Sequence, residues 1–152
     1  MLQVSLLDFL RGGRFGPIRL GATRAAIRDL LGEPHAVHIA TRRVAYEDIW
    51  KYGDFEFYFD DSHDGADILW MIYTDEFTIP RCGSGVDVDP WLLRWDLPLA
   101  EATAALSGAG VGWDPHPAPP PDMDSIVTTG GVHLGFPHAE KGLQVINILL
   151  PR

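Results

Sequence analysis

A helix followed by hairpin strands is predicted twice along the chain, and this order constrains the fold more than any other feature. Residues 17–77 contain a short extended entry, a helix, a strand hairpin and a further strand, and residues 95–150 repeat that order. We interpret this as an internal repeat of an α-β-β-β unit. At an offset of 77 residues, the alternating apolar residues Phe55, Phe57 and Phe59 align with Val132, Leu134 and Phe136. Alternate side chains share one face of a strand, so these residues are predicted to face the core. A duplicated unit of helix and sheet favours a scaffold that presents a surface over a cleft that holds a reaction.

The clearest predicted helix follows Thr23. Ala26, Ile27, Leu30 and Leu31 have helical spacing, and Gly32 with Pro34 ends the segment. A second helix is predicted over 100–106, after Pro98, which suits a helix start. Residues 2–11 also have one apolar face and are predicted to be helical up to Gly12.

Apolar alternation and turn residues predict the strands. Residues 91–95 are predicted as a short helix or a strand, and the proline-rich segment 115–121 as irregular. Strands joined by tight hairpins are antiparallel, so the fold class is α+β, with helices packed on one face of an antiparallel sheet. Residues 1–152 are predicted to form a single compact domain. The predicted strands are 37–41, 44–51, 55–59, 68–73, 125–128, 132–136 and 143–149.

The charge balance excludes some partners. A net charge of −9 disfavours nucleic acid and anionic membrane surfaces, both of which attract Lys and Arg, and it suits a basic protein partner. Acidity for solubility alone is the plain alternative. The single cysteine excludes an internal disulfide, and the N-terminal segment lacks the basic flank of a secretory signal. No apolar run approaches the ~20 residues that span a bilayer. We therefore expect a cytoplasmic protein.

Catalytic motifs are incomplete throughout the sequence. Residues 60–65 resemble the start of a calcium loop, but Met71 occupies the twelfth position, where a glutamate is required. Arg81 could lower the pKa of Cys82, although a lone cysteine beside a turn is more often incidental. We predict no catalytic residue and no cofactor. The alternative is a small metal-dependent hydrolase with a metal site at Asp60, His63 and Asp64, assisted by His35 and His38.

The aromatic residues are the main candidates for binding. On the strand that covers 45–52, alternation places Tyr46, Asp48, Trp50 and Tyr52 on one face. Aromatic side chains beside an acid are typical of a protein-binding surface, whereas the alternative interpretation is that they are core. The predicted partner-binding residues are Tyr46, Asp48, Trp50, Tyr52, Trp95 and Trp113.

Residues 20–34, Leu-Gly-Ala-Thr-Arg-Ala-Ala-Ile-Arg-Asp-Leu-Leu-Gly-Glu-Pro, carry a resemblance to known families. They resemble the helix of the small outer-membrane lipoproteins of β-barrel assembly and of the β-lactamase inhibitory protein superfamily. The resemblance to the inhibitor implies tandem helices on a four-stranded antiparallel sheet and a concave, aromatic and acidic inhibitory face. This chain lacks the lipidated cysteine of the lipoproteins and the paired cysteines of the inhibitor. Residues 50–57 with 31–34 are also similar to uncharacterised bacterial proteins that look like immunity proteins of toxin systems.

Together these patterns predict a non-enzymatic protein-binding domain of the immunity or inhibitor type, acting through an aromatic and acidic sheet face on another, basic protein. A small-ligand binding module is a further alternative to the hydrolase. A structural domain that oligomerises through an edge strand, such as 143–149, is the last.

Overall fold

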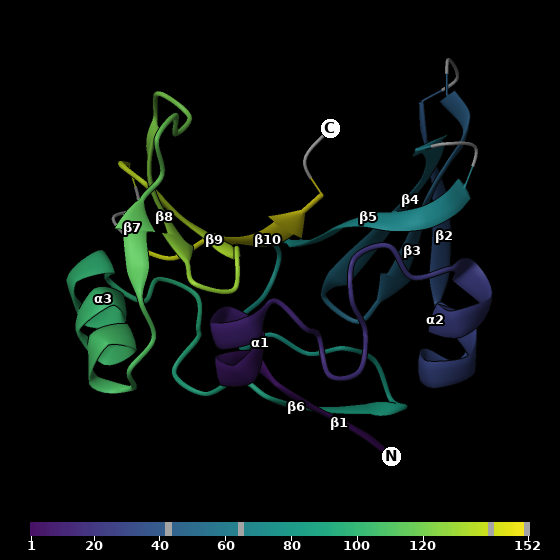
Figure 1. The fold of residues 1–152 in the computed structure, drawn as a ribbon. Coiled ribbons are helices and arrows are strands. Elements are labelled where there is room, and N and C mark those ends of the chain that lie inside the picture. Colours follow the sequence, from purple (N-terminus) through teal and green to yellow (C-terminus); the bar gives the residue numbers. More distant parts are fainter. Residues whose placement is uncertain (42–43, 64–65, 140–141, 151–152) are drawn as a thin grey trace.

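The chain folds around one large antiparallel sheet, and the helices lie on one side of it (Figure 1). The computed structural model describes residues 1–41, 44–63, 66–139 and 142–150. Within these ranges the element order is β1 (Leu2–Ser5), α1 (Leu6–Gly12), α2 (Arg24–Leu31), β2 (Ala36–Thr41), β3 (Val44–Tyr52), β4 (Phe55–His63), β5 (Ala66–Thr74), β6 (Val86–Asp89), α3 (Leu99–Gly108), β7 (Trp113–Pro115), β8 (Met123–Thr128), β9 (His133–Pro137) and β10 (Val145–Leu149).

The strands of both halves share the large sheet. Among the described residues it has eight strands in the order β2-β3-β4-β5-β10-β9-β8-β7. The halves meet where β5 and β10 pair antiparallel, with Ile72 opposite Ile148. The predicted α+β class with an antiparallel sheet is thus confirmed. The expectation that 143–149 is an edge strand is wrong, because β10 lies between β5 and β9.

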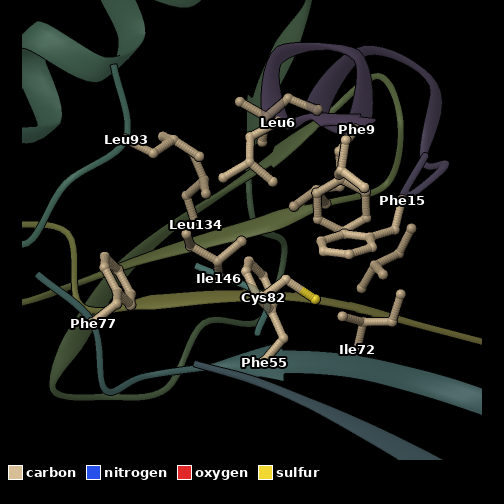
Figure 2. Packing of buried hydrophobic residues seen from close by; sticks show 14 of the residues in the cluster. Leu6, Phe9, Phe15, Phe55, Ile72, Phe77, Cys82, Leu93, Leu134 and Ile146 are labelled. Atoms are coloured by element: carbon tan, nitrogen blue, oxygen red, sulfur yellow. The ribbon is translucent and has the colours of Figure 1, made fainter. Parts of the chain in front are cut away.

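The apolar core lies between the large sheet and the helices. Phe55, Phe57 and Phe59 are fully buried, as are Leu134 and Val132, which confirms the predicted core faces. Phe15 lies between the sheet and α1, with its ring centroid 4.8 Å from that of Phe55. Figure 2 shows Leu6, Phe9 and Phe15 packed towards Phe55, Ile72 and Ile146 from the sheet. This packing gives the sheet one dry face.

The N-terminal segment differs from its prediction. Leu2–Ser5 is the strand β1, which pairs parallel with β6, and the helix begins only after Ser5. The Ser5 hydroxyl accepts a hydrogen bond from the backbone N–H of Asp8 at 3.2 Å and so caps α1. Apolar spacing over 2–11 matched a helix because a short strand and a short helix follow each other with their apolar sides towards the same core.

The turn between β8 and β9 holds the end of α1. The hydroxyl of Thr128, which is buried, donates to the carbonyl of Leu10 at 2.6 Å, and the Gly130 N–H donates to the same carbonyl at 3.0 Å. A Cβ atom at Gly130 would lie 2.5 Å from the backbone nitrogen of Gly13. The close approach of these backbones therefore requires glycine at position 130.

Residues 91–95 form neither the helix nor the strand expected of them. Trp91 and Asp96 have left-handed backbone angles, with φ of 54° and 62°, which interrupt regular structure on both sides of the segment. The carboxylate of Asp89 accepts a hydrogen bond from the Trp91 N–H at 2.9 Å and fixes the first of these turns.

The large sheet is curved. In Figure 1 the upper ends of β2 to β4 and of β7 to β8 project beyond β5 and β10 on the side opposite α1, so that β5 and β10 lie at the bottom of a hollow. The side of the sheet without helices is therefore concave. Among the described residues, no helix combines the length and the apolar content needed to cross a bilayer.

Candidate functional site

The concave side of the sheet carries a row of side chains that alternate with the core residues. Cross-strand pairing joins Lys51 to Glu56, Glu56 to Tyr73, Tyr73 to Asn147, and Asn147 to His133. All five side chains are half-buried, and no helix in the described part of the chain covers them. With their neighbours Tyr58, Trp70 and Met71 they define what we call the open face.

An aromatic cluster lies at the centre of the open face. The ring of Tyr58 lies 5.9 Å from that of Trp70 and 6.5 Å from that of Tyr73, each in an edge-to-face arrangement. Trp70 reaches this side because the pairing of β4 with β5 shifts register there, so that Tyr58 pairs with Met71 and Phe59 with Leu69. The rings are rigid and amphipathic, which suits contact with another molecule.

Two carboxylates set the charge of this cluster. The hydroxyl of Tyr58 donates to Glu56 Oε2 at 2.7 Å, and that of Tyr73 donates to Asp75 Oδ2 at 3.0 Å. Burial, and then the charge of Asp75, raises the pKa of Tyr73 to about 12. Burial and the hydrogen bond to Glu56 raise the pKa of Tyr58 as well. Both phenols are therefore protonated at neutral pH, and the negative charge resides on the two carboxylates.

A groove continues the open face towards β8. It has a volume of about 460 Å³ and is lined by Tyr73, Asn147 and Leu149 on one side and by His116, Pro120 and Met123 on the other. The proline-rich segment 115–121 forms this second wall, and the backbone N–H of His116 donates to the Ser125 carbonyl at 2.8 Å. The groove is open to solvent beside the aromatic cluster.

Two histidines meet in the groove. The ring centroids of His116 and His133 are 4.8 Å apart, and His116 Nδ1 accepts the backbone N–H of Ala118 at 2.9 Å. Burial, and then the proximity of His116, lowers the pKa of His133. This histidine faces away from the core, as its alternation with Val132 and Leu134 predicts.

The structure corrects the accessibility expected of Trp50 and Tyr52. Both side chains are only 4% exposed, because β3 turns them to the helix side of the sheet. The Trp50 ring packs 4.7 Å from the ring of Phe59, with the Arg28 guanidinium 4.7 Å from its centroid. The Tyr52 hydroxyl donates to the carbonyl of Gly32 at 2.7 Å. These residues belong to the core, and the aromatic cluster on the other side of the sheet is what sequence reasoning missed.

The remaining predicted partner-binding residues lie at separate places. The side chains of Tyr46 and Asp48 lie outside the part of the structure that is described. Trp95 is half-buried with its ring 5.8 Å from that of Phe77. Trp113 is half-buried beside α3, where its indole N–H donates to the Ser107 hydroxyl at 3.3 Å. The structure does not bring these two tryptophans together with the residues of β3.

Most of the side chains proposed for the alternative metal site lie outside the described part of the structure. Asp64 lies between the described ranges, and the side chains of Asp60 and His63 are outside them too, although both residues belong to β4 rather than to a loop. His35 and His38 are exposed, and His35 Nδ1 accepts the Gly53 N–H at 3.1 Å. Among the described residues, no group of three or more His, Cys, Asp and Glu side chains is placed to hold a metal ion.

Cys82 is buried in the core, contrary to the reactive setting considered for it. Burial, and then the charge of Asp54, raises the pKa of its thiol to about 12. Arg81 does not lower this pKa, because its side chain is exposed while the thiol faces inward. The thiol is therefore protonated and shielded at neutral pH.

Comparison of the chain with protein-family models, with curated proteins and with solved structures gave no match.

Proposed function

We propose that this chain is a non-enzymatic protein-binding domain of the immunity or inhibitor type, and that the open face contacts its partner. The observation that carries the proposal is the cluster of Tyr58, Trp70 and Tyr73 on a sheet face that no helix covers. A few residues supply most of the binding energy at protein interfaces, and Trp and Tyr are enriched among them.

The charges favour a basic partner. Glu56 and Asp75 accept the phenol hydrogen bonds of Tyr58 and Tyr73, so each of these two tyrosines has a carboxylate beside it. The whole chain has a net charge of −9. A complementary basic surface would be attracted at long range and oriented by these acids.

The order of the elements agrees with an internal repeat, which forms part of this proposal. α2 precedes β2 to β5, α3 precedes β7 to β10, and each set occupies one side of the β5–β10 junction. Two such units side by side double the width of the exposed sheet. This arrangement resembles the inhibitor family named above, in which a concave sheet presents the inhibitory residues.

Site-specific photocrosslinking tests the proposal in the cells that naturally produce the protein. A photoreactive phenylalanine replaces Met71 on the open face, and the matched control replaces Ala104, which is exposed on α3. We expect one protein to be crosslinked from position 71 and not from position 104. Equal yields from both positions, or none from position 71, would contradict the proposal.

The crosslinked protein then provides a quantitative test. Tyr73→Ala should weaken its binding by about 30-fold, since a central aromatic anchor contributes about 2 kcal/mol. Ala104→Ser is the control and should leave the dissociation constant unchanged. Unaltered binding of a folded Tyr73→Ala variant would assign the interface to another surface.

A further inference from the structure

A second cavity lies beside α3, across the shared wall residues His116 and Ser125 from the groove of the open face. It has a volume of about 470 Å³ and lies between α3 and the strands β7 and β8, and Figure 1 shows α3 beside β7. Leu99, Trp113, Pro115 and Ile126 give it apolar walls. A cleft of this size and lining suits a small organic molecule.

Most polar groups of this cavity are already bonded to the protein. The hydroxyl of Thr103 donates to the Leu99 carbonyl at 3.0 Å, and the indole N–H of Trp113 donates to Ser107. His116 accepts the Ala118 N–H through Nδ1. These bonds orient the polar groups in the walls of the cavity.

Asp124 is the acidic side chain among the described lining residues. Its side chain is 62% exposed at the cavity, and Oδ1 lies 3.1 Å from His138 Nε2. A carboxylate can accept about four hydrogen bonds, so this contact orients the group without saturating it. Of the described residues that line the cavity, none is a lysine or an arginine. The formal charge at this site is therefore negative.

We propose that this cavity binds a small organic amine, with its apolar body against Trp113 and Ile126 and its ammonium group on Asp124. A charge-assisted hydrogen bond to the carboxylate is stronger than a neutral one. The face of a tryptophan also attracts cations. The cavity shares His116 and Ser125 with the groove that continues the open face, but none of the residues Tyr58, Trp70 and Tyr73 lines it, so a ligand here lies outside the aromatic cluster.

A series of indoles with one body and three charges tests the proposal. Tryptamine is cationic, tryptophol is neutral and indole-3-propionate is anionic at pH 7, and calorimetry measures their binding to the full chain. We expect saturable one-to-one binding of tryptamine, at least tenfold tighter than tryptophol, and weaker binding still of the propionate. The absence of saturable binding, or equal affinities across the series, would overturn the proposal.

Two pairs of variants locate the site. Asp124→Asn should remove the preference for tryptamine over tryptophol, whereas Asp122→Asn, an exposed acid two residues away, should keep it. Ala100→Leu fills the cavity and should abolish binding, whereas Ala104→Leu, one helical turn further along α3, should not. Tryptamine binding that survives Ala100→Leu, or a preference that survives Asp124→Asn, would place the ligand elsewhere.

Discussion

Replacing Trp50 by alanine separates a structural role of this residue from a binding role. The side chain is 4% exposed and contacts the Phe59 ring and the guanidinium groups of Arg24 and Arg28. Truncation of a buried aromatic residue costs about 3–5 kcal/mol of the free energy of unfolding. Each lost cation–π contact adds about 0.5–1 kcal/mol at a partly exposed position. We therefore expect Trp50→Ala to destabilise the protein by about 4 kcal/mol or more.

Urea unfolding followed by circular dichroism measures this loss. The control is Val37→Ala, because Val37 lies directly opposite Trp50 on the edge strand β2 but is 55% exposed. Substitutions of exposed residues usually change stability by less than ~0.5 kcal/mol. A Trp50→Ala variant that lost less than about 1 kcal/mol would refute the reasoning, since its side chain would then contribute little to the core.

Two further predictions concern the α1 contact and the histidine pair. Gly130→Ala should destabilise the protein by about 2–4 kcal/mol in urea unfolding, because its Cβ would clash with backbone atoms of Gly13 and Leu10. Gly108→Ala is the neutral control, because a Cβ there meets no atom within 4 Å. Equal free energies of unfolding for the two variants would contradict the clash. The pKa of His133 is lower in the folded protein than in the unfolded chain. As the pH falls through 6.5, this histidine is therefore protonated in the unfolded chain before it is protonated in the folded protein, so acidification should reduce the free energy of unfolding. His133→Gln should reduce the loss of stability between pH 7.5 and 5.5, and an unchanged or steeper loss would show that other groups cause it.

The elements and the core were largely predictable, because the apolar alternation of Phe55 to Phe59 and the Thr23-to-Gly32 signals are local. Which side of β3 belongs to the open face was predictable only from the register in which β3 pairs with β4. Gly53 and Asp54 form a tight turn, which places Tyr52 opposite Phe55 and Trp50 opposite Phe57. Opposite residues share a face of the sheet, so Trp50 and Tyr52 had to share the core face of the phenylalanines. Alternation within β3 alone could not distinguish the core face from the open face, since both faces carry apolar and charged side chains.

Other features depend on contacts that no local pattern encodes. The pairing of β1 with β6 joins segments more than eighty residues apart, such as Leu2 and Val86. The open face required the register shift that brings Trp70 to that side of the sheet, and the cavity lined by Trp113 and Ile126 required α3 to pack beside β7. Such arrangements follow from tertiary packing, which overrides local sequence preference.

The central position of β10 has a consequence for synthesis of the protein. Residues 145–149 form the strand between β5 and β9, so the two halves of the sheet cannot be joined until this segment has left the ribosome. Until then β5 and β9 each have an unpaired edge in addition to the outer edges of β2 and β7, and such edges are templates for pairing with other chains. The first four-strand unit can form early, but its β5 edge stays uncovered until β10 pairs with it, and intermediates with such unpaired edges are prone to aggregate.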